Sequence, residues 1–142
     1  MFKKMFKGAT VAAIAVSIFT GGSSAYAVTG QDISITKESG SNYASTKDRP
    51  AGQQQYINGA GVNGIVSGEF VSGSGKAYVT VCKVKTGPFG AADECKLAIE
   101  FKSHNRGEIF LEKNALYYIK VSTDYADNSN KAVVKGYLRN YK

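Results

Sequence analysis

The chain has 142 residues, of which 18 are basic and 11 acidic, giving a formal net charge of +7. It contains one histidine, two cysteines and no tryptophan. This length suits a single domain, and the sequence carries no GxSxG, HExxH or P-loop motif. These features argue against a multidomain enzyme, a nucleotide-binding protein and a metalloprotein.

Residues 1–27 have the three parts of a cleavable secretory signal peptide. Lysines without any acid precede an almost unbroken apolar run from position 8 to 19, and Ala25-Tyr26-Ala27 matches a cleavage site. This run is shorter than the roughly 20 residues that span a bilayer, which favours cleavage over the alternative of an uncut anchor. We therefore expect a secreted, extracellular protein with no membrane association after cleavage.

The charge of the remaining chain limits its partners. Without the signal peptide, 115 residues carry 15 basic and 11 acidic side chains, a net charge of +4. Such a charge favours anionic partners such as cell-wall polymers, although it also serves solubility alone. Export and the modest charge argue against nucleic acid as a partner. No cofactor is expected.

The mature chain begins with a polar segment and continues as β-structure. Residues 28–55 predict a loosely ordered arm with at most one short edge strand, at 32–36. After it, glycine-rich turns separate short runs of Val, Ile, Tyr and Phe, which is typical of strands. Besides a weak strand near Gln55, we predict strands at 64–71, 76–84, 95–102, 108–112, 116–123 and 131–139. In the strand at 116–123, alternation places Tyr117, Ile119 and Val121 on one side, which should face the core. Residues 56–142 should thus form an all-β domain, a small antiparallel sandwich or barrel of about six to eight strands with one disulfide.

Two links and one strand carry specific expectations. Residues 73–76 (Gly-Ser-Gly-Lys) and 103–107 (Ser-His-Asn-Arg-Gly) predict a hairpin turn and a polar turn between strands. Basic residues recur at near-helical spacing at the end of the chain, so a helix is the alternative there. Adjacent Val133 and Val134 and an internal Gly136 favour a strand instead.

Cys82 and Cys95 are the only cysteines, and an even pair in an exported chain predicts a disulfide. The spacing does not fit a redox CxxC pair or a metal site. The bond closes a loop of 13 positions, which should stabilise the fold by about 3 kcal/mol.

The cysteines also suggest a hairpin register. With Cys82 opposite Cys95, Leu97 faces Thr80 and Ile99 faces Tyr78, and residues 95, 97, 99 and 101 form one apolar side. That register places Val79 and Val81 on the same side as the charged residues 96 and 100. This conflict between apolar and charged side chains would not arise if the strand were covered on both faces, or if the disulfide joined two different sheets.

The C-terminal strand is the strongest candidate binding site. In an extended chain its alternate residues share one face that interleaves cations with tyrosines, which can stack on sugar rings or clamp an anionic polymer. The alternative is a solvated strand whose lysines block aggregation. The candidate residues are Lys131, Lys135, Tyr137, Arg139 and Tyr141.

Two weaker candidates lie in predicted loops. The disulfide ties loop 83–94, with Pro88 and Phe89 at its tip, and such a loop is what an inhibitor presents, although an ordinary stapled hairpin has the same pattern. His104 is the only histidine, so any hydrolase mechanism that needs a histidine would have to use it. The sequence shows no catalytic partner for this residue. The loop 123–130 resembles a calcium loop in composition only. We therefore predict no catalytic, cofactor-binding or metal-binding residue.

Together these features predict a small secreted, non-enzymatic β-sandwich protein that binds the cell envelope, a polysaccharide or an anionic ligand. The partner would be a cell-wall polymer, a polysaccharide or an extracellular protein. The alternative is a secreted antagonist, meaning an antimicrobial toxin or a protease inhibitor that presents loop 83–94.

Overall fold

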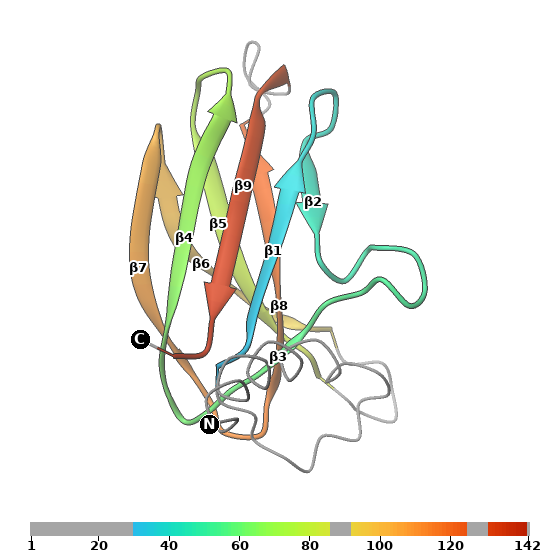
Figure 1. Ribbon diagram of the computed structural model, residues 1–142, viewed down its shortest axis with the longest axis vertical. Coiled ribbons are helices and arrows are strands. Elements are labelled where there is room, and N and C mark those ends of the chain that lie inside the picture. The colour runs from blue at the N-terminus through green and yellow to red at the C-terminus, as the bar shows by residue number, and fades with distance from the viewer. Residues whose placement is uncertain (1–29, 86–91, 125–130, 142) are drawn as a thin grey trace, which may run out of the picture.

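The computed structural model describes residues 30–85, 92–124 and 131–141. These residues form an all-β fold of nine strands and no helix, arranged as two antiparallel sheets packed face to face (Figure 1). The predicted signal peptide and the tip of loop 83–94 lie outside the described residues. None of the described segments is a helix of the length and hydrophobicity that crossing a membrane requires.

The two sheets are defined by their strand order. Sheet A contains β1 (Asp32–Lys37), β9 (Val133–Arg139), β4 (Val62–Ser72) and β7 (His104–Leu111), in that order across the sheet. Sheet B contains β2 (Tyr43–Ser45), β8 (Leu116–Thr123), β5 (Ala77–Lys83) and β6 (Glu94–Phe101), and β3 (Ile57–Asn58) also pairs with β8. The prediction of an all-β antiparallel fold with one disulfide is confirmed, and of the two predicted forms the structure has the sandwich and not the barrel. Of the nine strands in the described residues, β3 to β9 lie within 56–142, which gives seven where about six to eight were predicted.

Most successive strands lie in different sheets. The link 73–76 leads from β4 in sheet A to β5 in sheet B, so the predicted hairpin is wrong although the chain does turn there, through positive φ angles at Gly73 and Gly75. A local pattern marks the turn but does not say whether the flanking strands pair.

The predicted polar turn at 103–107 is also wrong, because β7 begins at His104 and pairs with β4 along its whole length. Its polar residues form an exposed strand instead of a turn. Side chains that point to solvent need not be apolar, so such a strand lacks the alternating apolar residues by which a strand is recognised. At the end of the chain the predicted strand is confirmed as β9, and the helical alternative is not found.

The N-terminal polar segment is part of both sheets. The predicted edge strand at 32–36 is confirmed as β1, but β2 is a second strand within residues 28–55, where at most one was predicted. Beside β1, hydrogen bonds link three buried polar residues, Gln31, Asn58 and Asn140. Asn140 Nδ2 donates to the Asn58 carbonyl, and the Asn58 N–H donates to Gln31 Oε1. Short polar runs can therefore be ordered by long-range bonds that their sequence does not reveal.

The β5–β6 hairpin has the predicted Cys82–Cys95 pair, and the disulfide joins these neighbouring strands within sheet B. Its register shifts between Val79 and Thr80, so that Val79 faces Ile99. This β-bulge at Ala98 overturns the predicted pairing of Tyr78 with Ile99. It also exchanges the faces of β6, because Ile99 and Phe101 are buried whereas Cys95 and Leu97 are exposed.

The two sheets approach closely because sheet A presents glycines to the core. A Cβ at Gly68 would overlap the Phe101 ring, and a Cβ at Gly136 would overlap Val121 Cγ2. Large side chains of sheet B therefore pack directly on the backbone of sheet A. The predicted inward side of β8 is confirmed, since Tyr117, Ile119 and Val121 belong to the core.

Candidate functional site

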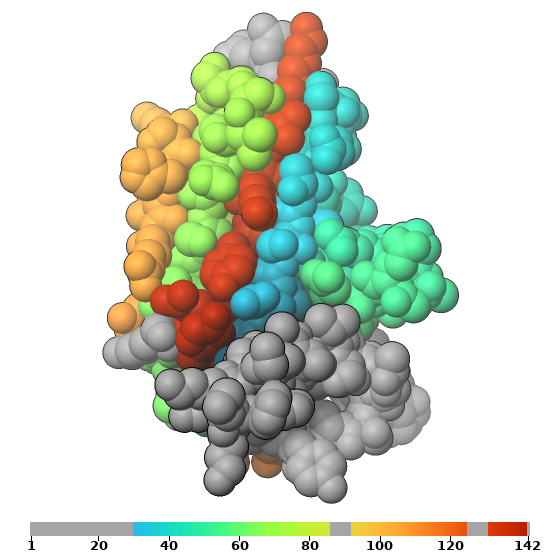
Figure 2. Space-filling model, viewed as in Figure 1, coloured from blue at the N-terminus to red at the C-terminus, as the bar shows by residue number. Residues whose placement is uncertain are grey.

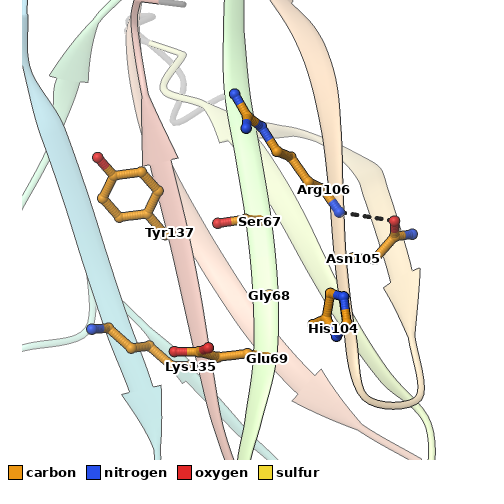
Figure 3. Close-up of a pocket in the computed structure, with 8 residues that line it drawn as sticks. All are labelled: Ser67, Gly68, Glu69, His104, Asn105, Arg106, Lys135 and Tyr137. Carbon is orange, nitrogen blue, oxygen red and sulfur yellow. Dashed lines mark hydrogen bonds between the residues drawn. The ribbon is translucent and has the colours of Figure 1, made fainter.

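The outer face of sheet A, which points away from the core, carries an open polar depression formed by β4, β7 and β9. Its volume is about 350 Å³. We call it the sheet A groove; Figure 3 shows the eight residues that line it, which are Ser67, Gly68, Glu69, His104, Asn105, Arg106, Lys135 and Tyr137.

Strand register assembles the groove from three distant parts of the sequence. Ser67 of β4 lies between Arg106 of β7 and Tyr137 of β9 in one row across the sheet. In the next row on the same face, Glu69 lies between His104 and Lys135. Alternation along each strand sends these side chains outward while intervening residues face the core. The groove is therefore a product of antiparallel pairing.

Tyr137 supplies the aromatic surface of the groove. Its ring is half-buried on the sheet, and its hydroxyl lies 3.5 Å from Asp32 Oδ2 on β1. Burial, followed by the nearby Asp32 charge, raises the pKa of Tyr137 to about 12. The phenol is protonated at neutral pH, and because its hydrogen points to Asp32, its oxygen can accept a hydrogen bond from a ligand.

Both signs of charge surround this ring, since Lys135 and Arg106 are basic and Glu69 is acidic. Within the described residues, the Arg106 guanidinium makes no hydrogen bond or ion pair, and Figure 3 shows it extended from β7. Its backbone N–H donates to Asn105 Oδ1 at 2.8 Å. A guanidinium without a protein partner can bind a carboxylate or phosphate in bidentate fashion.

His104 lies at the groove without the geometry of a catalytic base. Its Nδ1 is 3.5 Å from Ser103 Oγ, and no carboxylate bonds it among the described residues. A histidine that acts as a general base is usually oriented by a third group. Here the ring is an exposed polar side chain on a strand.

The structure separates the five residues predicted for the binding face. Lys135 and Tyr137 line the groove, whereas Arg139 continues the same side of β9 and lies with its Cζ 4.9 Å from the centre of the Tyr141 ring. Lys131 precedes the strand and does not line the groove. Sequence reasoning missed the contributions of β4 and β7, because nothing local indicates that β4 pairs with β9 and that β7 pairs with β4.

The outer side of sheet B is different, because a partly buried acid, Asp93, occupies it beside the disulfide. Asp93 Oδ2 accepts hydrogen bonds from Lys47 Nζ at 2.6 Å and from the Tyr118 hydroxyl at 2.8 Å, and Oδ1 accepts from the Lys85 N–H at 3.2 Å. These bonds, those from Lys47 foremost, lower the pKa of Asp93 to about 2.

The same network encloses Tyr118 and the base of loop 83–94. Lys47 Nζ lies 5.2 Å from the centre of the Tyr118 ring, and Tyr56 meets that ring edge-on at 6.2 Å. Burial, then the bond to Asp93, raises the pKa of Tyr118. The predicted loop residues Pro88 and Phe89 lie outside the described part of the chain. What the structure describes of this loop is a firmly held base.

Among the described residues, no cluster of three or more His, Cys, Asp or Glu side chains could hold a metal ion. Comparisons with protein-family models, curated proteins and solved structures found no match for this chain.

Proposed function

We propose that this chain is a small secreted, non-enzymatic binding module, and that the sheet A groove binds an acidic polysaccharide or another anionic polymer of the cell envelope. The observation that carries the proposal is the row on the outer face of sheet A in which Ser67 lies between Tyr137 and Arg106. The next row adds the ammonium of Lys135.

Each part of this row matches one feature of an acidic sugar chain. A flat aromatic ring can stack on the apolar face of a sugar, while Ser67 and Glu69 can bond its hydroxyl groups. Lys135 and Arg106 suit its carboxylate or phosphate groups. The groove is open along the sheet, so a polymer can lie across it without threading.

Secretion is the second part of the proposal. A small disulfide-bonded domain is compatible with an extracellular location, because disulfides persist in oxidising compartments. The sequence pattern of residues 1–27 supports export. The intact mass of protein recovered from culture medium should correspond to a chain beginning at Val28, and an uncut amino terminus would contradict this part.

Binding can be measured by retention of the protein on peptidoglycan, on teichoic acid and on glycan arrays at low salt. Tyr137→Ala and Arg106→Ala should each weaken retention about tenfold, or about 1.4 kcal/mol. Tyr137→Phe keeps the ring and should lose less. Lys120→Ala is the matched control, since it removes a lysine from β8 in the other sheet. No retention of the wild type at low salt, or equal loss in the control, would overturn the proposal.

The second candidate is the antagonist that presents loop 83–94, and the firmly held base of that loop favours it. The Cys82–Cys95 bond and the three hydrogen bonds to Asp93 fix both ends of the loop, which reduces the entropy lost when it binds. Phe89→Ala should abolish inhibition of a target protease without changing the melting temperature. Unaltered potency in that variant would exclude this loop as the inhibitory element.

A further inference from the structure

Strand β7 is the end strand of sheet A, and among the described residues no strand pairs with its side away from β4. On this side the Arg106 N–H donates to the Asn105 side chain, a bond that pairing with a further strand would replace. Strand β7 pairs with β4 through eight consecutive residues without a register shift. Figures 1 and 2 show β7 along one margin of the molecule, next to β4. Such an edge presents a row of backbone N–H and C=O groups that a further strand can pair with.

The other sheet edges are less suited to pairing. β6 is bent by its bulge at Ala98 and tied by its disulfide at Cys95, and β2 is only three residues long. On β1, the Ser34 carbonyl already accepts a hydrogen bond from Arg49 Nη2 at 3.4 Å. A bulge, a short strand and a covering loop are all devices that block edge pairing. Only β7 combines length with regularity.

The side chains of β7 are complementary to a second copy of the same strand. In an antiparallel pair centred on Gly107, Arg106 of each copy lies opposite Glu108 of the other. Centring the pair on Arg106 or on Glu108 would instead place like charges opposite each other, which is destabilising. The register centred on Gly107 therefore places two pairs of opposite charges across the dyad, and the five donors of a guanidinium leave Arg106 able to contact a ligand as well.

Two further features agree with this register. It places the Phe110 ring, which is 57% exposed, opposite His104 of the second copy, where the two rings can cover each other. Glu108 Oε2 already accepts a hydrogen bond from Asn63 Nδ2 at 3.1 Å, and this bond can remain, because a carboxylate accepts several hydrogen bonds at once.

We infer that the protein forms a symmetric dimer through antiparallel pairing of β7 with β7 of a second copy. The two four-stranded sheets A then become one continuous sheet, and the two sheet A grooves lie on the same side of it. A polymer with repeating acidic groups could contact both grooves, which raises avidity without a new contact. The dimer itself does not depend on the proposed ligand.

Sedimentation velocity of the protein produced from the full chain, over a range of concentrations, tests the dimer. The wild type should dimerise, and high salt should weaken the dimer. Glu108→Arg places two cationic side chains opposite each other on both sides of the dyad. It should raise the dissociation constant about tenfold or more, because two attractive pairs become repulsive.

The charge exchange R106E/E108R is the decisive variant, since it restores opposite charges in the same register and should recover the dimer. Lys120→Glu, a charge reversal on the other sheet, should have no effect. A monomeric wild type at every concentration, a dimer unaffected by Glu108→Arg, or no recovery in the double variant would each overturn the inference. Glu108 does not line the groove, and sedimentation without ligand reads the dimer alone, so failure of the dimer and failure of ligand binding are distinguishable.

Discussion

The two sheets of the sandwich differ on both of their faces. Sheet A turns glycines such as Gly68 and Gly136 toward the core and an open polar groove toward solvent. Sheet B turns large apolar side chains inward and carries the disulfide and the Asp93 network on its outer side. The side chains that line the groove do not belong to the core cluster, so that part of the face can carry binding residues at small cost in stability. The outer side of sheet B contributes to stability instead.

Removing the disulfide should have the largest effect. The C82A/C95A variant should lose about 3 kcal/mol of unfolding free energy, because the 13-position loop is no longer closed in the unfolded chain. Denaturant unfolding without reductant measures the loss, with reduced wild type as the control. Retention on the polymer should persist in the folded fraction. Equal stability of variant and wild type would mean that the crosslink does not stabilise sheet B.

A methyl group on the glycine-lined face should cost somewhat less. Gly136→Ala should lower the unfolding free energy by about 2 kcal/mol, because the new Cβ overlaps Val121 and forces the sheets apart. Lys135→Ala, one position earlier on the opposite face, is the matched control and should change stability by less than about 0.5 kcal/mol. Similar unfolding curves for the two variants would remove the contrast between the two faces of sheet A.

The Asp93 network should make stability depend on acid. The pKa of Asp93 in the folded chain is lowered from 3.8 to about 2. The contribution of Asp93 to the free energy of unfolding is therefore complete above about pH 4 and is lost as the pH falls toward 2. We expect a loss on the order of 1 kcal/mol, since Lys47 is 41% exposed and solvent screens part of the attraction. Asp93→Asn should flatten the profile between pH 4 and pH 2. An unchanged profile in that variant would assign the acid sensitivity to other carboxyl groups.

Changes in the sheet A groove should have the smallest effect on stability. The double variant R106A/K135A removes two cations that line the groove, and its melting temperature should stay close to that of the wild type, because exposed side chains contribute little. Its retention on teichoic acid should fall by more than that of either single variant. A large drop in melting temperature with unchanged retention would mean that this face serves the fold and not a ligand.

Several elements of the fold could be predicted because their signal is local. The alternation of Tyr117, Ile119 and Val121 predicted the inward side of β8, and the single pair of cysteines left one possible disulfide. The bulge at Ala98 could not be predicted, since it depends on which residues of β6 pack in the core between the two sheets. His104 was assigned to a turn because a polar strand that faces solvent has the composition of a loop.

The candidate site was predictable only along β9, where Lys135 and Tyr137 alternate with core residues. Ser67, Glu69 and Arg106 join them through strand pairing over many tens of residues, and no local pattern encodes such pairing. The sequence by itself determined that the chain forms strands and which cysteines pair, because side-chain period and residue count are properties of short segments. Only the tertiary structure decided which strands are neighbours and therefore which polar side chains share a face.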